Sequence, residues 1–152
     1  MALGFGREQV AHPLDGFGML IPSRAGRRTL GVLFSSTLFP GRAPAGQVLL
    51  TAFIGGVRNE AVATLDEAEI VRQVLADLTP LLGIRAAPVF ERVRRWLHAI
   101  PQYELGHLER LARIDARLAR LPGLHVRANW RDGISVADCV ANAAQFAGQL
   151  SD

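Results

Sequence analysis

The residues best suited to chemistry lie at 128–139, in the stretch Ala-Asn-Trp-Arg-Asp-Gly-Ile-Ser-Val-Ala-Asp-Cys. Ser135 and Asp138 form a variant of the capping box, with aspartate in place of glutamate, which predicts a helix start directly after a glycine turn. The first N–H groups of a helix lack partners within it and carry the positive end of its dipole. The stretch therefore predicts a site for an anion or an electron-rich ring. A purely structural glycine turn gives the same pattern, so both interpretations stay open at this point.

A second stretch, residues 94–107, joins a predicted strand to a predicted helix through Pro101. Trp96 and Tyr103 lie near this crossing. Aromatic side chains at such a place either flank a planar ligand or fill the seam between two parts of a fold. Residue spacing alone does not separate these two interpretations.

Acid–base, nucleophilic and metal chemistry find little support in the sequence. His98 and His107 have no carboxylate or nucleophile at a diagnostic spacing. Cys139 falls on the apolar side of the last predicted helix, which favours a core residue over a nucleophile. A lone cysteine with scattered histidines is not a zinc pattern. We therefore predict no catalytic residue and no metal site in this chain.

Length and composition narrow the class of protein. The 152 residues allow one domain or pieces of two, and 49% hydrophobic with 20% charged residues excludes a disordered chain. No apolar run is long enough to span a membrane, and the first eight residues lack the pattern of a signal peptide. The single cysteine fits a reducing compartment. These features predict an unexported, cytoplasmic, globular chain.

The positive charge of the chain comes from arginine alone: all 17 basic residues are arginine, and the net charge is +3 at pH 7. Four of them share one predicted helix, at positions 110, 113, 117 and 120. Glu109 and Asp115 interrupt them and no aromatic residues interleave, so we predict no nucleic-acid binding and favour a solvated helix face. A peripheral contact with anionic lipid stays open, because a basic amphipathic helix can lie on a membrane surface. The position of the helix in the fold decides between these two.

Hydrophobic periodicity predicts an α+β fold in which strands dominate the first half. Alternating or β-branched runs bounded by glycine and proline predict strands at 16–22, 29–39 and 47–54, with a further strand already under way at Leu3. The first half is predicted to be an antiparallel meander. A helical stripe follows, with a capping box at Thr64 and a closing glycine at Gly83.

The second half alternates strands and helices. We predict a strand at 88–96, a helix at 107–121, a short strand at 124–129 and a last helix that starts at Ser135. The last helix is expected to bury one apolar side, made of Val136, Cys139, Val140, Ala143, Ala147 and Leu150.

Five segments, in this order, carry a resemblance to a known family. They are Asp15–Pro22; Leu30–Ser36 with Phe39-Pro40; Phe53–Gly56; Ile100–Tyr103 with Leu105–His107; and Gly133–Val136 with Asp138-Cys139. Together they resemble the C-terminal third of the oxygen-dependent protoporphyrinogen oxidases, FAD enzymes of the flavin amine oxidase superfamily. The resemblance covers essentially the whole chain.

This resemblance implies a fold and a set of site residues. Residues 1–98 would form the C-terminal part of a substrate-binding domain with an antiparallel or mixed sheet. Residues 99–152 would be a strand–helix return to a FAD-binding domain, so that the chain is an incomplete two-domain flavin oxidase fold. The cofactor-binding residues implied are Trp96, Asn129, Gly133, Ile134, Ser135 and Val136. The substrate-binding residues implied are Phe17, Leu20 and Phe53.

The resemblance also implies a reaction, the oxidation of protoporphyrinogen IX to protoporphyrin IX by FAD and molecular oxygen in porphyrin and haem biosynthesis. Since the cofactor carries the redox step, no acid–base pair is expected in this segment. The porphyrinogen would be the substrate, and the choice between protoporphyrinogen and coproporphyrinogen stays open. The alternatives are a segment of another flavin amine oxidase or of a coproporphyrinogen oxidase-type relative, and a non-catalytic porphyrin- or partner-binding remnant.

The chain departs from this family in the parts that hold the cofactor. Family members bind the FAD pyrophosphate through a strand, a G-x-G-x-x-G turn and a helix, and this sequence holds no such motif. Ala128 stands where the family usually has glycine. We therefore expect the chain to share FAD with a missing N-terminal segment, which a separate reading frame could encode, and to be inactive alone. Whether the chain is by itself an enzyme stays open.

Overall fold

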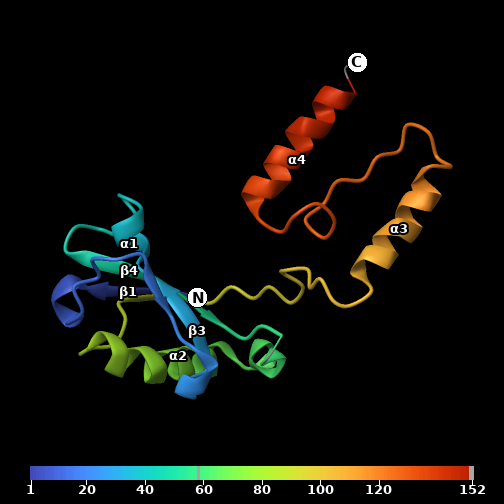
Figure 1. Ribbon diagram of the computed structural model, residues 1–152. Coiled ribbons are helices and arrows are strands. Elements are labelled where there is room, and N and C mark those ends of the chain that lie inside the picture. The colour runs from blue at the N-terminus through green and yellow to red at the C-terminus, as the bar shows by residue number, and fades with distance from the viewer. Residues whose placement is uncertain (58, 151–152) are drawn as a thin grey trace. The chain divides into compact units, whose positions relative to one another are not determined.

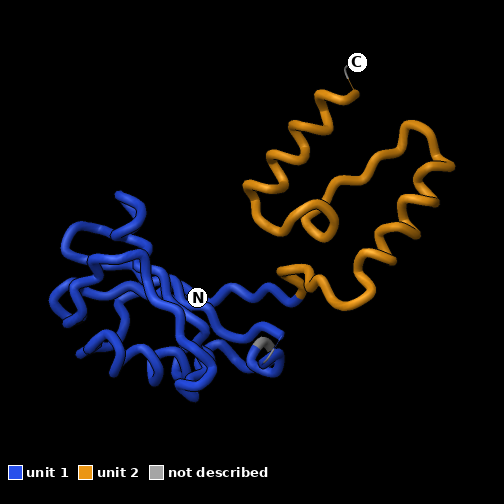
Figure 2. The backbone as a smooth tube through the Cα atoms, viewed as in Figure 1, with its two compact units in different colours: residues 1–97 blue, residues 98–152 orange. Residues whose placement is uncertain are grey.

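The computed structural model describes residues 1–57 and 59–150, which fall into two compact units, Met1–Leu97 and His98–Asp152 (Figure 2). We call them unit 1 and unit 2. Their boundary lies one residue before the predicted domain boundary at 98. The assignment of these parts to a substrate-binding domain and to a FAD-binding domain stays a prediction.

Unit 1 is built on a five-stranded sheet in which every pair of neighbours is antiparallel, in the order β2-β3-β4-β1-β5 (Figure 1). The strands are β1 (Ala2–Gly6), β2 (Gly18–Leu20), β3 (Thr29–Leu33), β4 (Gln47–Ile54) and β5 (Phe90–Arg92). Short 3-10 turns lie at Arg7–Gln9, Ser23–Ala25 and Glu60–Thr64. The predicted α+β fold, the antiparallel meander of β2, β3 and β4, and the early strand around Leu3 are confirmed.

The predicted strand 29–39 is wrong in its second half. The chain leaves the sheet after Leu33 and forms the short helix α1 (Ser35–Leu38). Hydroxyl groups hold α1 beside β4: the Ser35 and Thr51 oxygens lie 2.7 Å apart, and the Leu49 N–H donates to Ser36 Oγ over 3.0 Å. Serine side chains that bond to nearby groups compete in this way with a strand ladder.

The core of unit 1 lies between one face of the sheet and α2 (Glu67–Leu82). Side chains alternate along β4, so that Val48, Leu50 and Ala52 are buried on the same face, as the two-residue repeat of a strand requires. From α2, residues at helical spacing complete this core, namely Val74, Leu78 and Leu82.

The ends of α2 show which sequence signals decide helix boundaries. The helix is capped by Asp66, whose carboxylate accepts from the Glu69 N–H over 2.7 Å. The predicted start at Thr64 is wrong because the 3-10 turn Glu60–Thr64 occupies that residue. The predicted end is confirmed: Gly83 has a φ of 60°, the left-handed conformation that favours glycine at a helix C-terminus.

Unit 2 contains two helices, α3 (His107–Leu118) and α4 (Val136–Gln149), joined by residues 119–135 (Figure 1). The predicted start of the last helix after Ser135 is confirmed. The predicted strand 124–129 is wrong: residues 119–135 form no strand. The described part of unit 2 contains no other strand to pair with them, and a lone strand would leave its N–H and C=O groups without partners.

The predicted burial of the apolar side of α4 is also wrong. Val136, Val140 and Leu150 are exposed by 82%, 64% and 59%, and Ala143 and Ala147 are exposed too. Only Cys139 of the predicted set is half-buried. No side chain in the described part of unit 2 is fully buried. Among the described residues, no helix is long and apolar enough to cross a bilayer.

Candidate functional site

Two of the three predicted substrate residues lie in one row across the sheet of unit 1. Leu20 on β2 pairs with Gly31 on β3, and Gly31 pairs with Phe53 on β4. Paired residues of antiparallel strands place their side chains on the same face. Leu20 is 90% exposed and Phe53 is 49% exposed, on the face opposite the core. The sheet register therefore brings Leu20 and Phe53 together from positions far apart in the sequence.

Gly31 leaves the centre of this row without a side chain. A Cβ atom added there would lie 2.7 Å from the Met19 carbonyl oxygen and 3.2 Å from a Leu20 methyl carbon. Any larger residue would force β2 and β3 apart. The row therefore consists of two apolar side chains separated by backbone that carries no side chain. This shape suits a broad, flat apolar ligand.

Phe17, the third predicted substrate residue, lies outside this row. It precedes β2, and its carbonyl oxygen accepts from the Phe34 N–H over 3.1 Å. Its ring is 68% exposed. The structure leaves it accessible but does not join it to Leu20 and Phe53.

The same open face extends toward the opposite edge of the sheet, which the sequence interpretation missed. The next row runs from Leu33 through Thr51 and Ala2 to Arg92 on the edge strand β5, and the exposed Phe90 lies beside it. The two-residue alternation of β4 places Thr51 on the face of Phe53. The pairing that brings Arg92 to this face links residues 90 positions apart and leaves no local sequence signal.

In unit 2, four of the predicted cofactor residues form the start of α4. Ser135 Oγ accepts from the Asp138 N–H over 3.0 Å, and the Asp138 carboxylate accepts from the Ser135 N–H over 3.3 Å. This reciprocal capping box is the one that the sequence predicted. Ile134 and Val136 are exposed by 40% and 82%. The helix start is therefore well formed and accessible.

Gly133 shapes the turn that leads into α4. Its φ is 133°, a backbone conformation that side-chain-bearing residues rarely adopt. A Cβ atom added there would lie 2.6 Å from Cβ of Asp138. Only glycine therefore fits the turn while Asp138 caps the helix.

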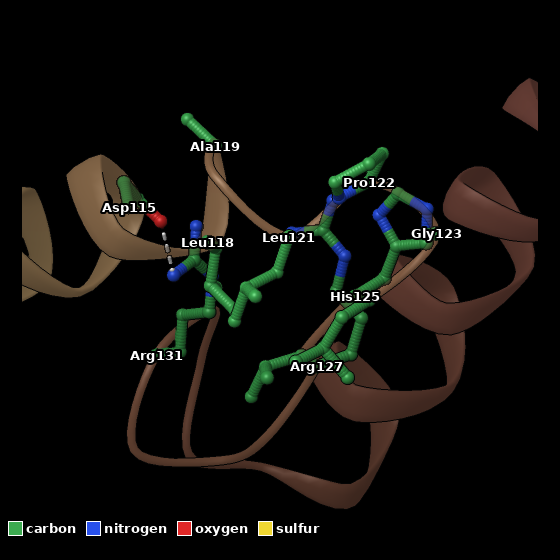
Figure 3. A pocket seen from close by; sticks show the side chains of 11 residues that line it. Asp115, Leu118, Ala119, Leu121, Pro122, Gly123, His125, Arg127 and Arg131 are labelled. Atoms are coloured by element: carbon green, nitrogen blue, oxygen red, sulfur yellow. Dashed lines mark ion pairs between the residues drawn. The ribbon is translucent and has the colours of Figure 1, made fainter.

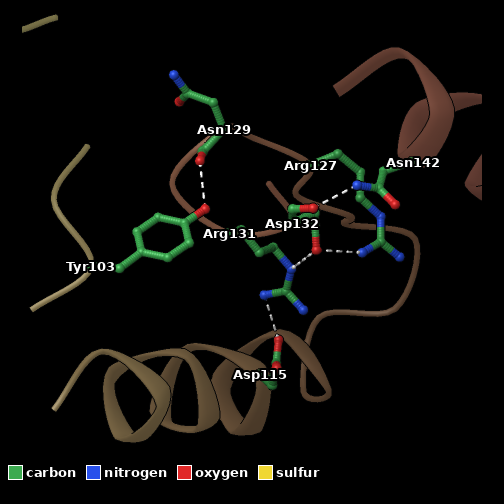
Figure 4. A network of polar contacts seen from close by, with 7 residues as sticks. All are labelled: Tyr103, Asp115, Arg127, Asn129, Arg131, Asp132 and Asn142. Carbon is green, nitrogen blue, oxygen red and sulfur yellow. Dashed lines mark hydrogen bonds and ion pairs between the residues drawn. The ribbon is translucent and has the colours of Figure 1, made fainter. Parts of the chain in front are cut away.

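A network of charged side chains fixes the preceding loop (Figure 4). The Asp132 carboxylate forms ion pairs with Arg127 and Arg131, each over 3.3 Å. Arg131 also pairs with Asp115 of α3 over 2.7 Å, and this hydrogen-bonding contact raises the pKa of Arg131. Asn142 of α4 donates to the Asp132 carbonyl oxygen over 2.5 Å. The loop is thus tied to both helices of unit 2.

Asn129, another predicted cofactor residue, enters this network through its backbone. Its carbonyl oxygen accepts from the Tyr103 hydroxyl over 2.7 Å, and the Tyr103 ring stacks on His107 at a centroid distance of 4.2 Å (Figure 4). The network residues Asp115 and Arg131 were not predicted from the sequence. They lie 16 positions apart in the sequence, and no short motif links such positions.

An open hollow of about 340 Å³ lies between the end of α3 and residues 121–127 (Figure 3). Its apolar lining includes Leu118 and Leu121. The charged residues at its edge, Asp115, Arg127 and Arg131, are paired within the network described above. The hollow therefore offers a ligand few free charged groups.

Trp96 belongs to unit 1, whereas the other five predicted cofactor residues belong to unit 2. Its ring is 69% exposed, with the Arg94 guanidinium carbon 5.1 Å from the ring centroid. Its assignment to one site with the residues of α4 stays a prediction. In the described residues, no group of three or more histidine, cysteine or acidic side chains is placed to hold a metal ion.

Comparison with known proteins gives the family. The model of the flavin-containing amine oxidoreductases matches residues 2–149. This chain belongs to that family. Among its relatives, the mitochondrial protoporphyrinogen oxidase of Nicotiana tabacum is 40% identical over 146 residues, covering 94% of this chain and 29% of the relative. The coproporphyrinogen III oxidase of Bacillus subtilis is 29% identical over 141 residues, covering 92% of this chain and 30% of the relative.

A solved structure supports the same relationship. The crystal structure of a protein from Exiguobacterium sp. 255-15, provisionally named protoporphyrinogen oxidase, superposes with a TM-score of 0.81 at 25% identity. The superposition covers 98% of this chain and 33% of that protein. The chain thus spans about three tenths of the length of the curated relatives that it matches, in their C-terminal part. The predicted resemblance to the protoporphyrinogen oxidases is confirmed.

Membership of this amine oxidoreductase family implies a flavin cofactor, and the start of α4 fits one. The Asp138 N–H is satisfied by Ser135, which leaves the N–H groups of Val136 and Ala137 to find acceptors outside the helix. These groups and the helix dipole suit the electron-rich edge of a flavin ring. Gly133 contributes indirectly, because the space beside it is taken by Asp138, the residue that caps the helix start.

Proposed function

We propose that this chain supplies the substrate-facing sheet and the flavin-facing helix start of an FAD-dependent porphyrinogen oxidase that converts protoporphyrinogen IX to protoporphyrin IX. The observation that carries this proposal is the exposed apolar row formed by Leu20, Gly31 and Phe53 on the sheet face opposite the core. A family relationship to enzymes named protoporphyrinogen oxidase supports it.

The open sheet face suits a tetrapyrrole in shape and in charge. A porphyrinogen presents apolar faces and carries its carboxylates at the rim of the macrocycle, and large apolar side chains bind such faces by excluding water. Arg92 lies on β5, two strand spacings or about 10 Å from β4, which carries Phe53. We assign Arg92 the role of pairing with a substrate carboxylate while Leu20 and Phe53 contact the macrocycle.

The start of α4 would hold the flavin ring rather than react with substrate. Hydride acceptance from the substrate and reoxidation by molecular oxygen are the chemistry that FAD supplies when bound. The N–H groups of Val136 and Ala137 would donate to the ring edge on which negative charge develops. The capping box at Ser135 keeps these donors in place. In this proposal no side chain of the chain transfers a proton.

The dinucleotide part of FAD needs a second polypeptide segment. The sequence has no G-x-G-x-x-G turn, so the chain has no cradle for the pyrophosphate. We propose that an N-terminal FAD-binding portion, encoded separately, completes the site and that the chain is inactive without it. We also propose a cytoplasmic location, which cell fractionation with a tagged chain tests.

The substrate face is tested on the chain alone by titration with protoporphyrin IX, followed by fluorescence anisotropy. Leu20→Glu and Phe53→Glu should each raise the dissociation constant at least about tenfold, since each removes apolar contact and adds a like charge. Leu30→Glu is the matched control, because Leu30 lies at the register shift of β3 and outside the row. Equal losses in all three variants, or no binding by the wild-type chain, would overturn this assignment.

The oxidase part is tested separately. The chain and the product of a neighbouring reading frame that carries G-x-G-x-x-G are co-purified with FAD, and the visible flavin band and the appearance of fluorescent protoporphyrin are measured. A yellow, active complex supports the proposal. Porphyrin binding by the chain, together with a colourless and inactive mixture, would instead support a non-catalytic porphyrin-binding module, the second candidate that the missing dinucleotide motif favours.

A further inference from the structure

Asp77 of α2 ties the start of β3 to the helix that covers the core of unit 1. One of its carboxylate oxygens accepts the N–H groups of Arg28 and Thr29, over 2.9 and 2.8 Å. The other oxygen forms an ion pair with the Arg27 guanidinium over 3.6 Å. The Asp77 side chain is only 13% exposed, so these contacts lie largely away from water. One side chain therefore binds three successive residues where the chain enters β3.

The pairing register of β3 shifts directly after these contacts. Thr29 pairs with Ile54. Two residues further along β3, Gly31 pairs with Phe53, which is only one residue away on β4. Leu30 is therefore an extra residue in β3, as in a β-bulge. A ladder that continued regularly from Thr29 would place Leu30 instead of Gly31 opposite Phe53. The centre of the apolar row lacks a side chain because of this shift.

The position of β2 also depends on the start of β3. The strand has three residues and lies at the edge of the sheet, with β3 as its neighbour. Beyond Leu20 the pairing continues with one more hydrogen bond, in which the Ile21 N–H donates to the Leu30 carbonyl oxygen over 2.9 Å. Leu30 directly follows Thr29, whose N–H group Asp77 binds. A displacement at the start of β3 would therefore move Leu20 as well.

We propose that Asp77 is a positioning residue for the apolar row formed by Leu20, Gly31 and Phe53. Its carboxylate keeps the start of β3 in the shifted register, so that the row keeps its open centre and Leu20 stays at the end of the row. Asp77 belongs to α2, on the core side of the sheet, and does not touch a ligand on the open face. This inference rests on the proposed function, because it concerns the face to which we assign the tetrapyrrole.

An effect of charge alone makes the opposite prediction. Removal of the negative charge of Asp77 would by itself favour a ligand that carries carboxylates, whereas loss of its position-keeping contacts weakens binding. The two N–H groups need an acceptor oxygen, which the side-chain amide of asparagine also supplies. Asp77→Asn and Asp77→Ala remove the same charge, and only the alanine variant lacks the acceptor. The pair of variants therefore separates geometry from charge.

The first test asks whether Asp77 keeps β2 in place, by hydrogen exchange of backbone amides in the full chain. The Ile21 amide should exchange about tenfold faster in Asp77→Ala than in the wild type, because its acceptor lies next to the lost contacts. The Phe34 amide donates to the Phe17 carbonyl oxygen over 3.1 Å at the other end of the β2–β3 pair. It should keep its wild-type rate, which shows that the variant stays folded.

The matched control removes a carboxylate from the other end of the same helix. Asp66 accepts the Glu69 N–H over 2.7 Å and lies 11 positions before Asp77, about 16 Å along the helix axis. Asp66→Ala should weaken the start of α2 and leave the Ile21 amide at its wild-type rate. Equal acceleration in Asp66→Ala and Asp77→Ala would indicate a general loosening of α2 and overturn the positioning role. Unchanged exchange of Ile21 in Asp77→Ala would overturn it too.

The second test measures the effect on the row, by titration of the same variants with protoporphyrin IX. Asp77→Ala should raise the dissociation constant about fivefold through partial loss of the Leu20 contact, and Asp77→Asn should stay within about twofold of the wild type. Asp66→Ala should bind like the wild type. Unchanged binding by Asp77→Ala, or equal losses in both Asp77 variants, would overturn the proposal. A wild-type chain that binds no porphyrin would overturn the proposed function instead, and the exchange rates still decide whether Asp77 holds the strands.

Discussion

Unit 1 and unit 2 are held together by different forces. In unit 1, thirteen buried apolar residues from the sheet, its loops and α2 form one continuous core. In the described part of unit 2, no side chain is fully buried, and the loop 119–135 is fixed by ion pairs and hydrogen bonds around Asp132. One chain therefore combines a unit organised by burial with a unit organised by charge.

This difference has energetic consequences. Burial of one large apolar side chain contributes about 1.5–3 kcal/mol, whereas an ion pair near the surface contributes about 0–1 kcal/mol. Unit 1 should resist unfolding by itself, and unit 2 should open at a much lower free energy. The exposed leucines and valines of α3 and α4 are then available for contact with other molecules.

The largest expected effect comes from the core of unit 1. Leu50→Ala should lower the free energy of unfolding by about 2–5 kcal/mol, because Leu50 is fully buried and its removal leaves a cavity. Leu118→Ala, in half-buried α3, should cost less than about 1 kcal/mol. Urea unfolding followed by far-UV circular dichroism measures both. Equal losses would show that the two units are stabilised alike.

A smaller effect is expected at the turn before α4. Gly133→Ala should destabilise this turn by about 1–3 kcal/mol, because alanine would be forced into a positive φ and against Asp138. Hydrogen exchange of the amides at 134–139 measures the loss. Gly148→Ala is the control, since no atom lies within 4 Å of the added Cβ and α4 gains helix propensity there. Amide exchange that is faster in Gly148→Ala but unchanged in Gly133→Ala would contradict the backbone strain assigned to position 133.

The charged network around Asp132 should contribute less to the stability of unit 2 than the Gly133 turn does. Arg131→Met removes the partner of Asp115 and Asp132 and should lower the opening free energy of residues 127–134 by about 1–2 kcal/mol. Arg113→Met, at an exposed arginine of α3 that forms no ion pair in the described part of the chain, should change it by less than about 0.5 kcal/mol. Hydrogen exchange of the same amides compares the two variants. If they behave alike, charge does not hold unit 2 together.

The smallest effect is a pH dependence in unit 1. Hydrogen bonds from Arg72 and then Gln73 lower the pKa of Glu69 from 4.5 to about 2. Because the folded pKa lies below the unfolded one, this stabilisation is complete above pH 4.5 and is lost as the pH falls toward 2. The melting temperature of Glu69→Gln should therefore lie slightly below wild type at neutral pH and converge with it in that window. A difference in melting temperature that persists near pH 2 would contradict the role assigned to Glu69.

Local signals in the sequence predicted those elements that depend on neighbouring residues. The Ser135–Asp138 capping box, the Gly83 terminator and the alternation of β4 all act within a few residues, and the structure has each of them. The predicted strand 124–129 was wrong because an apolar run becomes a strand only beside a partner.

In the candidate sites, too, the sequence predicts what depends on neighbouring residues and misses what depends on distant ones. The family resemblance singled out Leu20 and Phe53, but only the register of three strands shows that they share a row with Gly31. The start of α4 followed from its own residues. The Asp115–Arg131 pair could not be predicted, because it depends on how a loop folds back on a helix sixteen residues away.

The absence of lysine from the basic residues limits how this molecule can be modified. All 17 basic side chains are guanidinium groups, which keep their charge throughout the physiological pH range. Acetylation of lysine and ubiquitin attachment to lysine have no side-chain target in this chain, and arginine methylation would preserve the charge. The positive charges of Arg110, Arg113 and Arg117 on α3 are therefore permanent. The strength of their interactions is adjusted from outside the chain, by the ionic strength of the solution.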